Sequence, residues 1–81
     1  MNTNDDVKLA SKKQIQYFGL LVNKLVRTLK QKGVYNNKEY DPIICLCRAF
    51  YNGIKAREHI ESCQLSYVID EIKDTLNELN R

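Results

Sequence analysis

The chain has 81 residues, of which 43% are hydrophobic and 28% are charged. This length and composition predict one globular domain whose core is close to the lower limit of useful size, and no run of about 18 apolar residues is present that would span a membrane. The net charge of +3 is by itself too small to indicate nucleic-acid binding.

The charge is unevenly distributed along the chain. Residues 1–40 carry a net charge of +5, residues 41–60 carry +1 and residues 61–81 carry −3. The first nine residues have neither the basic start nor the apolar run of a signal peptide, and three cysteines without such a signal are typical of a reducing compartment. We therefore expect a cytoplasmic protein with free thiols.

The first predicted element is a long amphipathic helix over residues 11–33, which follows a flexible lead-in over residues 1–10. Ser11 and Gln14 have the spacing of a capping box, and Gly33 stands where a left-handed terminator belongs. Gly19 lies beside the apolar stripe, which predicts a close approach of another helix. The stripe itself consists of Ile15, Phe18, Val22, Leu25, Val26 and Leu29.

A second helix is predicted over residues 42–52, after a loop over residues 34–40. Asp41 and Pro42 are expected as its N-cap and first-turn residue, and Asn52-Gly53 as its end. Its apolar arc is broad, which is typical of a central helix buried against two neighbours. The arc consists of Ile43, Leu46, Cys47 and Phe50, extended sideways by Ile44 and Tyr51.

The last part of the chain predicts a short separate helix or helical turn over residues 54–61 and a closing helix over residues 63–79, capped by Ser62. The closing helix has an apolar stripe of Leu65, Val68, Ile69, Ile72, Leu76 and Leu79. The predicted fold is all-α, a compact bundle of three principal helices plus a short fourth helix or turn. Residues 11–81 form this single helical domain.

The outer face of the first helix is the most informative surface. Lys24 and Arg27 fall on the side opposite the apolar stripe, together with Tyr17 and Leu20. A solvated helix face can carry such residues, since scattered surface apolar residues are normal. We nevertheless expect Tyr17, Leu20, Lys24 and Arg27 to contact a partner, because apolar and aromatic anchors supply most interface energy.

A second hypothesis is a DNA- or RNA-binding regulator that uses the basic residues to neutralise phosphates. A third is a homodimer that buries Ile44 and Tyr51 against a second copy. Against nucleic-acid binding, no convincing helix-turn-helix spacing is present and the last helix is acidic. The candidate nucleic-acid contacts are Lys12, Lys13, Lys24, Arg27, Lys30, Arg48, Lys55 and Arg57.

The cysteines and the single histidine form a C-x-C-x11-H-x3-C pattern that nominally supplies four zinc ligands: Cys45, Cys47, His59 and Cys63. Residues i and i+2 of a helix point about 160° apart, so the first two ligands do not converge. No nucleophile turn, desolvated acid pair or glycine-rich phosphate loop is evident. The sequence therefore predicts no metal, no cofactor and no catalytic residue.

Two patterns resemble small helical modules of phage and plasmid proteins. The first is the opening Ser11-x-Lys13-Gln14-x-x-Tyr17, and the second is the closing Ser66-x-x-Ile69-x-x-Ile72. The resemblance implies a mobile-element context rather than an activity. Small phage proteins of this kind often act by binding a host or defence protein, as anti-CRISPR proteins do. The favoured expectation is thus a non-enzymatic inhibitor or regulator that binds a protein.

Overall fold

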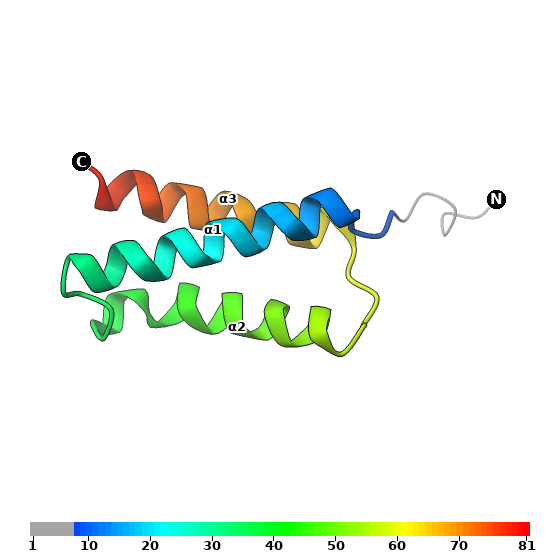
Figure 1. Cartoon of the computed structure of the whole chain (residues 1–81), viewed down its shortest axis with the longest axis horizontal. Coiled ribbons are helices and arrows are strands. Elements are labelled where there is room, and N and C mark those ends of the chain that lie inside the picture. The colour runs from blue at the N-terminus through cyan, green and yellow to red at the C-terminus, as the bar shows by residue number, and fades with distance from the viewer. Residues whose placement is uncertain (1–7) are drawn as a thin grey trace.

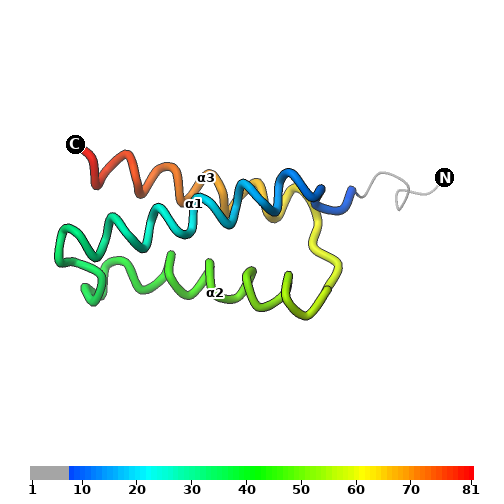
Figure 2. Tube along the Cα trace, in the orientation of Figure 1, coloured from blue at the N-terminus to red at the C-terminus, as the bar shows by residue number. Residues whose placement is uncertain are grey.

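Three α-helices make up most of the computed structural model, which describes residues 8–81. They are α1 (Lys12–Gln31), α2 (Asp41–Lys55) and α3 (Ser62–Leu79), and a short 3-10 helix, η2 (Lys38–Tyr40), leads into α2. Helices α1 and α3 run in the same direction and α2 runs in the opposite one (Figure 1). The two connections lie at opposite ends of the bundle (Figure 2). This arrangement confirms the predicted all-α class.

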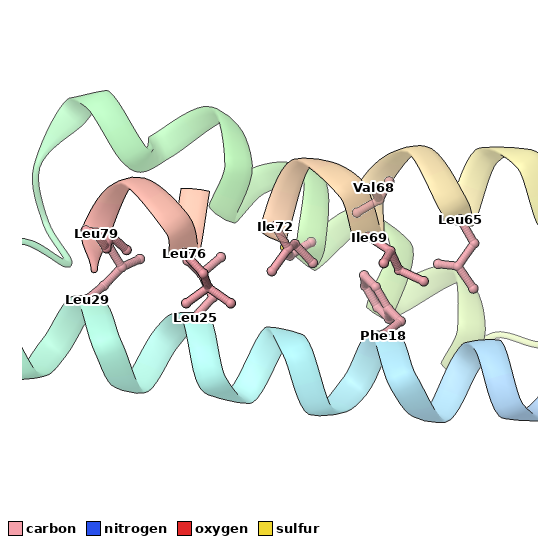
Figure 3. Packing of buried hydrophobic residues seen from close by; sticks show 10 residues of the cluster. Phe18, Leu25, Leu29, Leu65, Val68, Ile69, Ile72, Leu76 and Leu79 are labelled. Atoms are coloured by element: carbon pink, nitrogen blue, oxygen red, sulfur yellow. The ribbon is translucent and has the colours of Figure 1, made fainter. Parts of the chain in front are cut away.

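The core is built mainly between α1 and α3. All six residues of the predicted α3 stripe are buried, and Phe18, Leu25 and Leu29 face them from α1. Figure 3 shows the pairing: Phe18 lies against Ile69, Leu25 against Leu76, and Leu29 against Leu79. Each fully buried side chain of this size contributes about 1.5–3 kcal/mol of transfer free energy. The spacing of apolar residues in the sequence therefore identified the buried faces of α1 and α3, although it did not predict that these two helices would form the main contact.

Helix α2 is less buried than its broad apolar arc predicted. Only Cys47 and Gly53 of this helix are buried, while Ile43, Ile44, Leu46 and Phe50 are partly buried against the core. The predicted packing of α2 against two neighbours is confirmed, since it contacts both α1 and α3, but α2 is not a deeply buried central helix. The reason is that α1 and α3 pack directly on each other, so α2 rests on the side of that pair.

Both ends of α1 are closed as predicted. The Ser11 hydroxyl accepts a hydrogen bond from the backbone N–H of Gln14 at 3.1 Å. At the other end Gly33 has a φ of 71°, its N–H donates to the Lys30 carbonyl at 3.1 Å, and the Val34 N–H donates to the Leu29 carbonyl at 3.0 Å. These two bonds form a Schellman motif, which needs the left-handed conformation that glycine adopts at little cost.

The side chain of Gln14 does not complete a capping box, contrary to the prediction. Its Nε2 donates to the Ser62 carbonyl at 2.8 Å and to the Ser66 hydroxyl at 2.9 Å, and its Oε1 accepts from the Ser62 hydroxyl at 2.9 Å. The amide therefore joins the first turns of α1 and α3. Ser62, expected as a cap, is the first residue of α3, and Glu61 is the N-cap instead.

The chain just before α1 is tied to the chain just before α3. The Ala10 N–H donates to the Ile60 carbonyl and the Ser62 N–H donates to the Lys8 carbonyl, both at 2.8 Å, around an isolated bridge between Leu9 and Glu61. Residues 8–10 of the predicted lead-in are therefore hydrogen-bonded to the segment that precedes α3. Residues 1–7 of that lead-in lie outside the described residues.

The boundaries of α2 also differ from the prediction. Tyr40 rather than Asp41 is the N-cap, because η2 runs directly into the helix. The helix continues past Asn52-Gly53 and ends at Lys55, and Arg57, two residues later, has a φ of 59°. The N–H groups of Arg57 and Glu58 donate to the carbonyls of Ile54 and Gly53 at 3.1 and 3.0 Å, a second Schellman motif.

Residues 54–61 therefore form no helix of their own. Residues 54–55 complete α2, residues 56–57 form a turn, and residues 58–60 lead without helical structure into α3. The predicted separate helix or helical turn over residues 54–61 is therefore absent, and only the two-residue turn at residues 56–57 is present. Within residues 8–81, no helix combines the length and the apolar character needed to cross a bilayer.

The Gln14 amide should contribute measurably to stability. Replacement of Gln14 by Ala removes all three side-chain hydrogen bonds and should lower the free energy of unfolding by about 1–2 kcal/mol. Urea denaturation measures the change. Gln16→Ala is the matched control, because Gln16 is exposed on the same helix and the difference in helix propensity is the same. Equal stability of the two variants would contradict the role given to Gln14.

Gly19 should be replaceable with a gain in stability. A β-carbon at Gly19 would meet no neighbouring atom within 4 Å, so the predicted close approach of another helix is absent. Gly19→Ala should therefore raise the free energy of unfolding by about 0.5–1 kcal/mol through helix propensity. Gly33→Ala should lower it, because the φ of 71° is strained for alanine. Thermal denaturation of both variants checks that the two substitutions change the stability in opposite directions.

Candidate interaction surfaces

The polar and charged side chains of the described residues all lie at or near the surface of the bundle. The buried residues with side chains are Phe, Leu, Ile, Val and one Cys, and no polar or charged side chain of residues 8–81 is buried. The charged groups of this part of the chain are consequently solvated. Their use depends on how the helices distribute them over the surface, together with the few apolar side chains left exposed.

The first surface is the outer face of α1, defined by Tyr17, Leu20, Lys24 and Arg27. At about 100° of rotation per residue, these four side chains fall within an arc of about 80° opposite the buried stripe. All four are exposed, Tyr17 by 43% and Leu20 by 68%. The structure thus places the four predicted partner-contacting residues on one accessible face.

The electrostatic character of this face comes from the composition of α1. The helix carries five cationic side chains and no carboxylate. Helix α3 lies beside it with exposed Asp70 and Asp74, so the basic and acidic ends of the chain become neighbours in space. The most basic and the most acidic helix of the bundle therefore lie side by side.

The eight cations of the nucleic-acid hypothesis are all exposed, but they do not form one stripe. Lys13 lies with Lys24 and Arg27 on the outer face of α1. Lys12 and Lys30 are rotated about 100–120° from Lys13 and Lys24, toward the side on which α2 packs. Arg48, Lys55 and Arg57 belong to α2 and the turn after it. A phosphate backbone would therefore have to contact two separate sets of cations.

The second surface is a groove between α1 and α2 of about 230 Å³. We call it the α1–α2 groove, and its lining residues are Val22, Asn23, Val26, Tyr35, Ile44, Cys47, Arg48 and Tyr51. Two lysines lie over its tyrosines: Lys30 Nζ is 5.2 Å from the centroid of the Tyr35 ring, and Lys55 Nζ is 5.5 Å from that of Tyr51. Cations at this distance are attracted to the ring face.

Sequence reasoning did not find this groove. It assigned Val22 and Val26 to the buried stripe, and both are only partly buried. The available signal was the position of Val26 at the edge of the apolar arc, about 100° from Leu25. Ile44 and Tyr51, predicted as a dimer contact, line the groove from α2.

The opposite side of α2 faces α3 across a groove of about 320 Å³. This groove is negative, whereas the α1–α2 groove is lined by Arg48 and has two lysines beside it. Glu39, Glu71 and Glu78 line the negative groove, and no lysine or arginine of residues 8–81 does. Burial raises the pKa of Tyr40 above its usual value, and the negative charges of Glu39 and Glu78 raise it further. The two grooves beside α2 therefore differ in sign, positive toward α1 and negative toward α3.

The residues of the C-x-C-x11-H-x3-C pattern are not gathered into a site. Cys45, His59 and Cys63 are exposed, whereas Cys47 is buried. Among the described residues, no group of three or more histidine, cysteine, aspartate or glutamate side chains is placed to hold a metal ion. Burial raises the pKa of the Cys47 thiol to about 11, so this thiol is uncharged at neutral pH and packs as a small apolar group.

The three thiols should consequently react in two classes. At pH 8 a thiol reagent such as dithionitrobenzoate should modify Cys45 and Cys63 rapidly and Cys47 at least tenfold more slowly, because Cys47 is 5% exposed and uncharged. Absorbance of the released chromophore measures the rates. In denaturant all three thiols should react at one rate, and Cys47→Ala should remove only the slow phase. Equal rates in the folded protein would contradict the burial of Cys47.

Comparison with protein-family models, with curated proteins and with solved structures found no match to this chain. A functional assignment therefore rests on the described surfaces themselves. Two of them, the outer face of α1 and the α1–α2 groove, combine exposed or half-buried apolar groups with positive charge.

Proposed function

We propose that this protein is a non-enzymatic helical binding module that contacts another protein through the outer face of α1. The observation that supports the proposal is the exposure of Leu20, 68%, in the middle of a helix face that also carries Tyr17, Lys24 and Arg27. Large apolar and aromatic side chains are the usual anchors of protein interfaces, and flanking charges set orientation.

The charges of this face select the chemistry of the partner. Lys24 and Arg27 lie about one and two turns after Leu20 on the same side of α1, and no carboxylate of α1 neutralises them. A partner surface with an apolar pocket and carboxylates around it would complement them. Complementary charges would also increase the association rate more than the affinity.

The biological setting that fits this proposal is inhibition or regulation of a host or defence protein by a mobile-element protein. It is supported by the resemblance of Ser11-x-Lys13-Gln14-x-x-Tyr17 and Ser66-x-x-Ile69-x-x-Ile72 to small phage and plasmid modules. A module of this kind needs a stable scaffold and one accessible face rather than a catalytic pocket. In the most specific version, the partner is a defence protein and the module inhibits it as anti-CRISPR proteins do.

A DNA- or RNA-binding regulator is the second candidate, favoured by the five cations of α1 and the exposed Tyr17 beside them. Lysines would neutralise phosphates and the tyrosine ring would stack on a base. The exposed Leu20 has no comparable role on a phosphate backbone, and the cations are divided between two sides of α1. Protein binding therefore accounts for more of the face.

Capture from nuclease-treated bacterial lysate separates the two candidates. A protein partner should be retained by the wild-type chain, and Leu20→Ala should weaken its binding at least tenfold, since an anchor is worth about 1.4 kcal/mol or more. Affinity is then measured by calorimetry with the purified partner. Tyr67→Ala is the matched control, because Tyr67 is 60% exposed on α3, away from the proposed face.

Salt dependence provides the contradicting outcome. Raising the salt concentration from about 50 to 200 mM should change the affinity for a protein partner less than tenfold. The affinity of a protein that makes 6–10 phosphate contacts falls by a factor of about 10³–10⁵ over the same range. In a parallel capture from lysate without nuclease, recovery of nucleic acid and no protein, abolished by Lys24→Glu/Arg27→Glu but not by Leu20→Ala, would replace the proposal by the second candidate.

A further inference from the structure

We propose that the α1–α2 groove is a second interaction surface, which binds an acidic amphipathic helix of a partner protein. This surface lies on a different side of α1 from Tyr17, Leu20, Lys24 and Arg27. The inference goes beyond the function proposed for the outer face and does not depend on it.

The floor of the groove is apolar and shaped for side chains. Val22, Val26, Ile44 and Cys47 form it from two helices, and none of these side chains carries a charge at neutral pH. Its volume of about 230 Å³ is smaller than the roughly 300–1,000 Å³ of pockets that enclose drug-sized ligands. A groove of this kind accepts a few apolar anchors of a helix at i, i+3 and i+4 positions rather than a whole cofactor.

The rim of the groove is positive. Arg48 lines it, and Lys30 and Lys55 lie over the rings of two other lining residues, Tyr35 and Tyr51. No carboxylate from the described part of the chain lines the groove. A helix with an apolar stripe and glutamate or aspartate beside that stripe would therefore place its charges against three cations of this chain, and the tyrosines would contact its apolar edge.

The same observations disfavour a second copy of the chain as the occupant. A twofold contact through this face would bring Arg48 and Lys55 of one copy toward the same cations of the other. The chain has an acidic amphipathic helix, α3, but all six residues of its apolar stripe are buried in its own core. Within residues 8–81, a folded second copy therefore offers no acidic helix with an exposed apolar stripe.

A synthetic peptide tests the inference directly. The probe is a fluorescein-labelled helix of 18 residues with leucine at i, i+3 and i+4 positions and glutamate elsewhere, and its control carries lysine in place of glutamate. Fluorescence anisotropy with the full chain should show binding of the glutamate peptide at least tenfold tighter than that of the lysine peptide. Equal affinity, or no binding of either peptide, would overturn the proposal.

Two variants with the same change of charge locate the binding site. Arg48→Glu in the groove should lower the affinity for the glutamate peptide at least tenfold, whereas Arg27→Glu on the outer face should change that affinity less than threefold. Both residues are exposed, so both variants should keep the fold, which circular dichroism checks. The reverse result would overturn the groove proposal and leave the outer-face function standing.

Two further outcomes concern other occupants. Displacement of the peptide by a 20-nucleotide single-stranded DNA, with binding of that DNA lost in Arg48→Glu, would assign the groove to nucleic acid and overturn the proposal. Sedimentation equilibrium showing a dimer of the wild-type chain that Ile44→Asp converts to a folded monomer would assign the groove to a second copy. A monomer that binds only the glutamate peptide is the expected result.

Discussion

The direct packing of α1 on α3 is the contact on which the rest of the structure depends. These two helices contribute nine of the ten buried hydrophobic side chains, and they run in the same direction (Figures 1 and 3). A chain can join two parallel helices only by returning along their length, and α2 provides that return. Because the main core is already complete between α1 and α3, α2 covers its side with partly buried residues and leaves a groove on each flank.

The polar contacts at one end of the bundle set the register of this packing. Gln14 donates and accepts hydrogen bonds with Ser62 and Ser66, and residues 8–10 pair with residues 60–62. Apolar side chains alone would tolerate a shift of one helix along the other by a turn, since leucine and isoleucine recur along both stripes. A directional amide that bonds to Ser62 and Ser66 at the start of α3 does not tolerate such a shift.

Charge divides the surface into regions with different chemistry. Helix α1 carries no carboxylate, and α3 together with Glu39 supplies the acidic side, so the two grooves beside α2 have opposite signs. The exposed Leu20 and the half-buried valines of the α1–α2 groove give the positive side of the molecule its apolar groups. Partners that combine negative charge with apolar anchors would match this side, whereas the acidic groove would repel them.

Periodicity and local hydrogen bonding were readable in the sequence, and contacts between distant residues were not. The spacing of apolar residues predicted all six buried residues of α3, and Ser11 and Gly33 predicted the ends of α1, because each depends on neighbours within one or two turns. The same periodicity placed Tyr17, Leu20, Lys24 and Arg27 on an exposed face. One partner of the Gln14 side chain, Ser62, lies 48 residues away, and the turn that terminates α2 places Arg57, a residue type that seldom adopts a positive φ, in the left-handed conformation. The shallow burial of α2, the free space at Gly19 and the α1–α2 groove follow from how three helices share one core, which only the tertiary structure decides.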